Sequence, residues 1–376
     1  MSEPGRQGTP FPFEGPVPPS LMIDRQRELA LLARRAADRV NVRLVAPRRF
    51  GKTSVTLAHA RTLRESGWRT AHVDLFRVAD VTDVARRVAA AYAALDVPWI
   101  RAHLSGLLAR IGVGLSASGP TVTVGPRPPA GHGADAEALL LELLDLPLTL
   151  WNRDQTPTLV VFDEFQDLLV ARRDLDGLLR SRIQYHQDAA AYVFCGSEPS
   201  MMRELFEARA RPLFGQATPL TLGPLPLADV AAELAARYGD EGLDPGLALG
   251  ELVAFAAGHP QRTMLLAYLL AERLADGQPG TPAVAREVID EAIAQTAAGL
   301  RAMWNGLDAN ERAVLAAIAD GVAPSSTALA ASHGVARSTL NNAAERLVDQ
   351  GHLQRDGDRG AIAVVDPLLA EWVRQR

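Results

Sequence analysis

The chain has 376 residues, 48% of them apolar and 22% charged, which is enough material for two or three globular domains. Its formal net charge of −5 excludes a protein that coats nucleic acid through overall positive charge, but leaves room for a local basic face. Cys195 is the single cysteine, which excludes an internal disulfide. The sequence contains no uninterrupted apolar run of about 18 residues, so no membrane span is expected. The N-terminus lacks the pattern of a signal peptide, so we expect a cytoplasmic protein.

The first part of the chain alternates between predicted helices and strands. Residues 1–20 are rich in Pro and Gly and are predicted as a disordered lead-in. Helical spacing of apolar residues predicts helices at 24–40, 53–66, 81–95, 101–115, 134–151 and 172–186. Short apolar runs predict strands at 41–46, 70–75, 158–162, 191–195 and 218–222, with a hairpin arm at 117–124. This alternation is typical of a parallel α/β sheet with right-handed crossovers, so we predict a core over 21–225 that carries an insertion at 100–133.

The second part of the chain is predicted to be helical. Residues 226–300 are expected to form a helical lid. In residues 301–376, helices are predicted at 311–319, 326–332 and 337–350, followed by two short strands at 352–355 and 361–365. Three helices followed by a two-stranded wing are typical of a winged helix-turn-helix.

Lys52 is the only lysine among the 39 basic residues. In an arginine-rich chain, a lysine persists where a planar guanidinium cannot replace the compact ammonium, as in a narrow phosphate pocket. The surrounding residues, Ala46-Pro47-Arg48-Arg49-Phe50-Gly51-Lys52-Thr53, follow a predicted strand and open a predicted helix. This is the context that a P-loop requires.

A P-loop at this position predicts binding of ATP and Mg²⁺. Backbone N–H groups surround the β-phosphate, Lys52 bridges the β- and γ-phosphates, and the Thr53 hydroxyl ligates Mg²⁺. The predicted nucleotide contacts are Pro47, Arg48, Arg49, Phe50, Gly51, Lys52, Thr53 and Ser54. The usual first Gly of the motif is Ala46 here, which is costly if the position needs a positive φ and tolerated if it is extended. We expect the extended conformation.

Two further strands end in polar residues. An apolar strand ends at Asp163-Glu164, where Asp163 is expected to hold Mg²⁺ through water and Glu164 to polarise the attacking water. The next strand ends at Gly196-Ser197, where Ser197 either contacts the γ-phosphate or the lytic water, or belongs to a simple turn. The N-K-x-D pattern that reads guanine requires a second lysine, so GTP is not expected.

Several motifs together resemble a known family. They are Met22-Ile23-Asp24-Arg25-Gln26-Arg27-Glu28-Leu29, the P-loop, Phe162–Asp167, Pro212–Gly215, Gly258–Pro260 and Asp366–Trp372. They resemble motifs of the archaeal-type ATPases of the STAND and AAA+-like branch, which are relatives of origin-recognition initiators. This resemblance implies an α/β fold, with a P-loop NTPase (AAA+-like) parallel sheet followed by a helical lid and a C-terminal winged helix.

The resemblance also points to arginines that could sense the nucleotide. In this family an Arg usually follows P-L-Y-G, but here Gln216 stands there, so the nearby Arg211 is a substitute candidate for the γ-phosphate. Arg262 follows Pro260 in a lid helix and is the better candidate for a sensor, with a solvated helix arginine as the alternative. Arg25 is placed either near the adenine or in a surface ion pair with Glu28.

The winged helix leaves two functions open. Residues at the start of its third helix suit contacts with DNA bases and phosphates, namely Arg337, Ser338, Thr339, Asn341 and Asn342. Against DNA, residues 301–376 hold eight arginines and nine acidic residues, a net charge of −1, and the wing sequence Asp356–Gly360 is acidic. The chain is therefore either an ATP-driven switch that contacts double-stranded DNA, or a signalling or defence-type STAND ATPase. In the second case the winged helix docks protein and ATP binding drives self-association. A P-loop protein that binds nucleotide without hydrolysing it is a third, weaker alternative.

Overall fold

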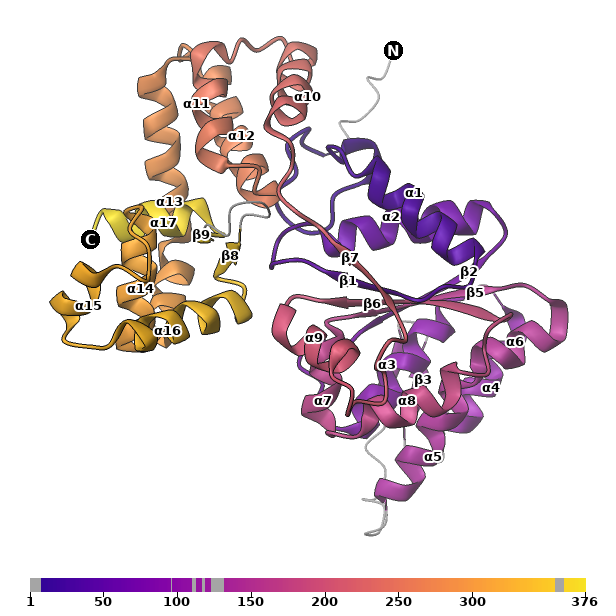
Figure 1. Cartoon of the computed structure of the whole chain (residues 1–376). Helices are drawn as coiled ribbons and strands as arrows, with labels where there is room; N and C mark the ends of the chain where they lie inside the picture. Colours follow the sequence, from indigo (N-terminus) through magenta and orange to yellow (C-terminus); the bar gives the residue numbers. More distant parts are fainter. Residues whose placement is uncertain (1–7, 96, 110–112, 117–118, 123–131, 356–361) are drawn as a thin grey trace, which may run out of the picture. The chain divides into compact units, whose positions relative to one another are not determined.

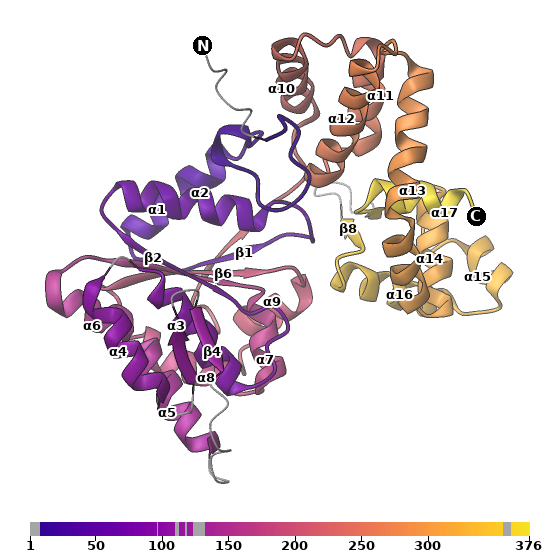
Figure 2. The same cartoon turned by 180° about the vertical axis from the view of Figure 1, so that it is seen from behind.

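The computed structural model describes residues 8–95, 97–109, 113–116, 119–122, 132–355 and 362–376 (Figures 1 and 2). The chain divides into two compact units. The sheet unit contains residues 26–45 and 55–221, and the helical unit contains the segment up to Arg25, residues 46–54 and residues 222–376. The P-loop thus belongs to the helical unit, whereas the residues that precede and follow it in the sequence belong to the sheet unit.

Five parallel strands form the sheet in the described part of the sheet unit, in the order β2-β5-β6-β1-β7. They are β1 (Val42–Val45), β2 (Arg69–Asp74), β5 (Thr158–Asp163), β6 (Ala190–Gly196) and β7 (Thr218–Thr221). When only these strands are counted along the chain, the order is 2-3-4-1-5, which is typical of P-loop NTPases. The predicted fold class is confirmed.

Helices cover both faces of this sheet. Helices α1 (Gln26–Ala37) and α2 (Lys52–Glu65) lie on one face, and α3 (Val81–Ala93), α8 (Leu175–Ile183) and α9 (Pro199–Glu207) lie on the other (Figures 1 and 2). Every residue of β5 and β6 is buried, because helices cover both faces of these strands, and the residues between Thr158 and Asp163 at the two ends of β5 are all apolar. Strand β7 contains Pro219, which lacks an N–H to donate and is tolerated because β7 is an edge strand.

The region between β2 and β5 differs from the prediction. The helix predicted at 101–115 is α4 (Pro98–Ala109), and β3 (Val113–Ser116) pairs antiparallel with β4 (Gly119–Val122). The single helix predicted at 134–151 is two helices, α5 (His132–Leu144) and α6 (Leu146–Asp154). Pro147 stands in the first turn of α6, and a proline there starts a new helix because it cannot donate the backbone hydrogen bond that would continue the old one.

The segments after β5 and β6 also differ from the prediction. The chain forms a 3₁₀ turn, η2 (Phe165–Asp167), and a short α7 (Leu168–Ala171) before α8, so the helix predicted at 172–186 is shorter. Helix α9 has no counterpart among the predicted elements, although Pro199 at its first position is a recognised start signal.

The helical unit begins with four helices, α10 (Leu227–Asp240), α11 (Gly246–Ala256), α12 (Pro260–Ala275) and α13 (Pro282–Gly306). The C-terminal module contains α14 (Ala309–Ala319), α15 (Thr327–His333), α16 (Arg337–Asp349), the antiparallel pair β8 (Leu353–Arg355) and β9 (Ile362–Val364), and α17 (Pro367–Arg374). The predicted boundary at 300/301 lies inside α13, and a continuous apolar core that includes Val288, Leu300, Leu315 and Leu369 runs through both parts. No helix in the described ranges has both the length and the hydrophobicity that a membrane span requires.

The N-terminal segment is packed against these helices, whereas the sequence predicts disorder up to residue 20. Phe11 is 1% exposed, and its ring centroid lies 4.7 Å from that of Tyr238. The Arg237 guanidinium donates hydrogen bonds to the carbonyl oxygens of Pro10 (2.9 Å) and Leu21 (2.8 Å), the latter at the end of η1 (Pro19–Leu21). The contact of Phe11 with Tyr238 and the hydrogen bonds from the buried Arg237 thus hold this Pro-rich segment in place. Residues 1–7 of the predicted lead-in lie outside the described residues.

Gly258, between α11 and α12, allows a close approach of two backbone segments and supports a stability prediction. Its φ is +75°, and a Cβ there would lie 2.3 Å from the Leu225 carbonyl oxygen. We expect Gly258→Ala to lower the free energy of unfolding by roughly 1–3 kcal/mol or more, as measured by urea denaturation. The matched control is Gly250→Ala in α11, where no neighbouring atom lies within 4 Å and the helix should gain about 0.5–1 kcal/mol. A Gly258→Ala variant as stable as the parent would contradict the prediction.

Candidate nucleotide-binding site

The P-loop has left-handed backbone at two positions. These are Arg49 (φ 66°) and Gly51 (φ 85°), and Ala46 is not among the left-handed residues of this fully described loop. Alanine therefore occupies the usual glycine position without the cost of a positive φ, as expected. Alternation of left- and right-handed residues directs successive backbone N–H groups to one side, which is the arrangement that binds anions. The strained Arg49 conformation is of the kind that persists at functional sites.

Lys52 is the first residue of α2 and is 6% exposed. Its Nζ donates a hydrogen bond to the carbonyl oxygen of Ala46 at 3.2 Å, so the side chain folds back over the loop. Two other residues predicted as nucleotide contacts have packing roles. The Ser54 hydroxyl accepts a hydrogen bond from the Val17 backbone N–H at 2.9 Å, and the buried Phe50 ring packs edge-on against His259 at 4.9 Å. Thr53 is half-buried.

Arg262 in α12 is 2% exposed, so the solvated alternative predicted for it is wrong. Its Nε lies 3.0 Å from Asp366 Oδ1 and its Nη2 lies 2.5 Å from Asp366 Oδ2, a bidentate ion pair. Its third nitrogen, Nη1, is buried and has no hydrogen-bond partner among the described residues. Asp366 belongs to a motif noted in the sequence, but it lies 104 residues from Arg262, so nothing in the sequence indicated that the two side chains pair.

His259 supports the start of the same helix. It is the N-cap residue of α12, and its Nδ1 accepts a hydrogen bond from the Arg262 backbone N–H at 3.3 Å. Burial lowers the pKa of His259 to about 4, so the ring is neutral near pH 7 and Nδ1 is able to accept. A capping histidine beside a buried guanidinium thus adds no further positive charge.

Three other arginines of the predicted site differ in burial. Arg49 is exposed as a residue, but its guanidinium is partly shielded from water. This shielding lowers its pKa, the positive charge of Arg262 lowers the pKa further, and the negative charge of Asp366 raises it. Arg49 of the P-loop and Arg262 of α12 therefore lie within electrostatic reach of each other. Arg48 is also exposed. Arg25 is 4% exposed, has a φ of 80°, and its Nη2 donates to the Gly223 carbonyl oxygen at 2.5 Å, so it does not lie on the surface. A contact of Arg25 with adenine stays a prediction.

The C-terminal module presents the first turns of α16 to solvent. Four of the five predicted DNA contacts are exposed and Thr339 is half-buried; the exposed ones are Arg337, Ser338, Asn341 and Asn342. Two other arginines near α16 are paired, since Arg346 donates to Glu311 (3.0 Å) and Asp308 (2.8 Å), and Arg355 pairs with Glu345. The acidic wing predicted at 356–360 lies outside the described residues.

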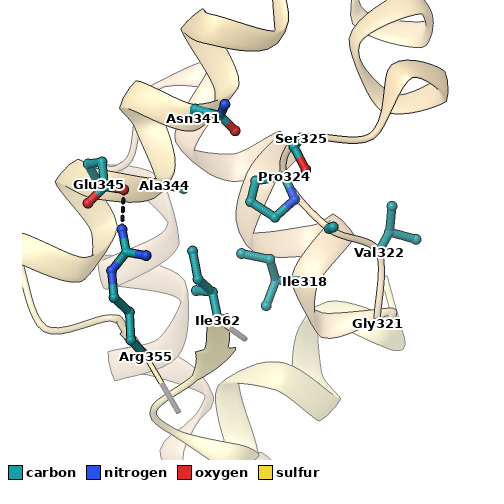
Figure 3. Close-up of a pocket in the computed structure, with 11 residues that line it drawn as sticks. Ile318, Gly321, Val322, Pro324, Ser325, Asn341, Ala344, Glu345, Arg355 and Ile362 are labelled. Atoms are coloured by element: carbon teal, nitrogen blue, oxygen red, sulfur yellow. Dashed lines mark hydrogen bonds and ion pairs between the residues drawn. The ribbon is translucent and has the colours of Figure 1, made fainter. Parts of the chain in front are cut away.

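A hollow of about 450 Å³ lies beside α16 and the strand pair (Figure 3). Ile318, Val322 and Ile362 supply apolar wall, whereas the Glu345–Arg355 pair supplies a polar one. Such a lining combines apolar surface with a few polar groups, as ligand and peptide pockets do.

The sheet unit holds the predicted catalytic carboxylate. Glu164 directly follows β5 in the left-handed conformation (φ 48°, ψ 49°), which is rare for a residue with a side chain. Its Oε2 accepts hydrogen bonds from the Ser197 hydroxyl at 2.6 Å and from Gln166 Nε2 at 2.7 Å. Ser197 and Gln166 are each 1% exposed. These contacts fix the carboxylate, so Ser197 does more than form a turn.

Gln166 is a residue that the sequence analysis did not place in the site. It belongs to the motif Phe162–Asp167, which was used only as part of the family resemblance. Its contact with Glu164 depends on the 3₁₀ turn, which brings the Gln166 amide back to the Glu164 carboxylate. Asp163 is 7% exposed, and its Oδ1 accepts from the Glu164 backbone N–H at 3.0 Å. His72 on β2 is a further neighbour, with its Nε2 3.9 Å from Asp163 Oδ2.

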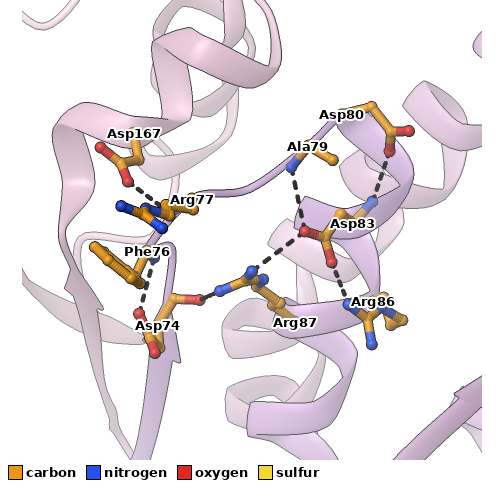
Figure 4. Close-up of polar contacts among 9 residues, drawn as sticks. All are labelled: Asp74, Phe76, Arg77, Ala79, Asp80, Asp83, Arg86, Arg87 and Asp167. Carbon is orange, nitrogen blue, oxygen red and sulfur yellow. Dashed lines mark hydrogen bonds and ion pairs between the residues drawn. The ribbon is translucent and has the colours of Figure 1, made fainter.

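The turn after β5 is also tied to the end of β2 (Figure 4). Asp167 Oδ2 accepts a hydrogen bond from the Arg77 backbone N–H at 2.6 Å, and Asp74 Oδ1 accepts one from the Phe76 backbone N–H at 2.8 Å. Arg87 donates to the Asp74 carbonyl oxygen at 2.8 Å. The first of these bonds joins the ends of two neighbouring strands, and the other two involve only the end of β2 and α3.

Arg211 is engaged within the sheet unit. Its Nη2 lies 2.8 Å from Glu204 Oε1 and its Nη1 lies 3.7 Å from Asp176 Oδ2. Gln216, which stands at the position of the family arginine, directs its Nε2 to the Phe214 carbonyl oxygen at 3.4 Å. A role of Arg211 at the γ-phosphate stays a prediction.

Comparison with known proteins supports the fold. No protein-family model and no curated protein matches the chain. Among solved structures, the Walker-type ATPase of Pyrococcus abyssi matches with a TM-score of 0.68 and 18% identity over 97% of this chain and 100% of that one. The Aeropyrum pernix ORC2 protein in ADPNP–ADP complexes matches with a TM-score of 0.61 and 15% identity, over 96% of this chain and 95% of that one. The ORC1 protein of that organism in complex with DNA matches with a TM-score of 0.50 and 18% identity, over 94% of this chain and 93% of that one. The chain is thus similar in fold to a Walker-type ATPase and to origin-recognition proteins of archaea.

Proposed function

We propose that this protein is an ATP-dependent molecular switch of the STAND/AAA+-like type that binds ATP and Mg²⁺ at the P-loop and hydrolyses ATP. The observation that carries the proposal is the carboxylate of Glu164, held by Ser197 and Gln166 at the end of β5. A general base must be fixed within reach of the proton it removes, and these two hydrogen bonds fix it.

The order of the sheet supports a binding site at the carboxyl ends of its central strands. Strands β5, β6 and β1 are parallel neighbours, so their carboxyl ends share one edge of the sheet. Asp163 ends β5, Ser197 follows β6, and Ala46 follows β1 in the chain. Open α/β sheets bind ligands at the carboxyl ends of their strands.

The residues present suit a nucleotide and its metal ion. Left-handed Arg49 and Gly51, together with Lys52 and the N-terminus of α2, form an arrangement that favours phosphate oxygens. Thr53 and Asp163 would hold Mg²⁺, which usually takes one or two protein ligands beside phosphate and water. Mg²⁺, when bound, would shield the negative charge of the phosphates. Glu164 would accept a proton from water, and Arg262 would sense the terminal phosphate.

The C-terminal module is proposed as the output of this switch, with DNA as its partner. Exposed Arg337, Ser338, Asn341 and Asn342 at the start of α16 suit base edges and phosphates. The second candidate is a protein partner, favoured by the neutralised Arg346 and Arg355 and by the hollow beside α16. In that case the C-terminal module would dock protein, and ATP binding would drive self-association of the protein.

A gel shift with duplex DNA, with and without ATP, separates these two outputs. We expect salt-sensitive binding by the parent protein and about tenfold weaker binding by Arg337→Ala. The matched control is Arg301→Ala, which removes one exposed charge from α13 of the same unit and should bind like the parent. Absence of salt-sensitive binding in either nucleotide state would overturn the DNA output and favour protein docking.

A further inference from the structure

We infer that Asp366 is a positioning residue that withholds the lid arginine Arg262 from bound nucleotide, so that only a terminal phosphate of ATP can displace it. The inference rests on the proposed function and concerns the regulation of the same site. The Arg262–Asp366 pair is called the latch below.

The latch joins two segments that are distant in the sequence. Arg262 comes from the first turn of α12, and Asp366 is the N-cap residue of α17, where its Oδ1 also accepts a hydrogen bond from the Leu368 backbone N–H at 3.0 Å. Helix α17 is anchored in the apolar core by Leu368 and Leu369, which are 0% and 1% exposed. The carboxylate is thus attached to the C-terminal module, and its hold on Arg262 couples that module to the lid.

The two partners differ in how they would tolerate separation. Arg262 is 2% exposed and one of its nitrogens already lacks a partner among the described residues, so an unpaired charge there would be costly. The Asp366 side chain is 20% exposed and would keep its bond to Leu368. Burial alone would raise the pKa of Asp366, but Arg262 outweighs it and the pKa lies below its usual value. Arg262 therefore needs another anion before Asp366 can leave.

The P-loop is where such an anion would come from. Arg49 of the loop senses the charges of both Arg262 and Asp366, and the neighbouring His259 ring contacts Phe50 of the loop. The charges of Arg262 and Arg49 are thus both within reach of the Asp366 carboxylate, and Arg48 adds a further positive charge beside Arg49. ATP offers a terminal phosphate that ADP lacks, and a guanidinium binds phosphate as readily as carboxylate. The latch should therefore open with ATP and stay closed with ADP.

The test compares the affinities of full-length variants for fluorescent ATP and ADP analogues. Asp366→Asn removes the charge but retains an N-cap acceptor for α17, so the helix should persist. We expect its affinity for ATP relative to ADP to rise at least about fivefold over the parent ratio, because opening the latch no longer opposes ATP binding. The matched control is Asp308→Asn, since Asp308 is the N-cap of α14 and pairs with Arg346 at 2.8 Å. It should leave the ratio unchanged.

Hydrogen exchange on the parent protein tests the same inference without any variant. By reciprocity, an ATP analogue should speed amide exchange in α17 and ADP should not. An unchanged affinity ratio in Asp366→Asn, or equal α17 exchange with both nucleotides, would overturn the latch while the proposed function stands. A parent protein that binds neither nucleotide would overturn the proposed function, and the latch with it.

Discussion

Lys52→Ala is expected to abolish measurable ATP binding, a loss of roughly 100-fold or more in affinity. Hydrogen bonds to charged groups contribute about 1.5–3 kcal/mol each, and an ammonium beside two phosphates makes more than one of them. Lys52 is 6% exposed, and its ammonium group lies against the loop at the Ala46 carbonyl oxygen. Titration with a fluorescent ATP analogue measures the effect.

The control for Lys52 removes a positive charge from the same helix. Arg61 lies on α2, is well exposed and pairs with Glu65 at 3.0 Å, so Arg61→Ala should bind ATP like the parent. Lys52→Arg separates charge from shape, because a planar guanidinium is too wide for a narrow phosphate pocket and should also bind poorly. Parental affinity in Lys52→Ala would contradict the P-loop assignment, and parental affinity in Lys52→Arg would contradict the argument from shape.

Glu164→Gln is expected to retain ATP binding and to lower the hydrolysis rate by about 100-fold or more. A glutamine keeps the shape of the side chain but cannot accept the proton of the attacking water, and general-base catalysis typically contributes 10²–10⁴-fold. The side-chain oxygen of the glutamine still accepts from Ser197, so the site should stay assembled. Phosphate release under saturating ATP, measured beside binding, checks both halves of the prediction.

Asp167→Asn is the matched control, since it also removes one carboxylate from the turn after β5. Its side-chain oxygen can still accept from the Arg77 backbone N–H, as Asp167 does at 2.6 Å, so we expect a near-parental rate. Parental turnover by Glu164→Gln would exclude Glu164 as the base. Loss of binding in that variant would show that Glu164 is needed to hold the nucleotide instead.

The comparison of sequence with structure separates local signals from distant contacts. The glycine–lysine loop between a strand and a helix, the apolar runs of β5 and β6, and the order of helices and strands are each encoded over a few neighbouring residues. Periodicity and motif spacing therefore predict them. The prediction of a single helix at 134–151 was wrong because of one residue. Pro147 starts α6 inside a leucine-rich stretch whose periodicity otherwise predicts one continuous helix.

By itself, the sequence determined the fold class, the P-loop around Lys52 and the acidic end of β5. The tertiary structure alone decided that Phe11 anchors the N-terminal segment, that Gln166 turns back to Glu164, and that Arg262 is held by Asp366. Each of these depends on where a side chain lies after the chain has folded. A buried arginine and a solvated one look alike in the sequence, because burial comes from the partners that packing supplies.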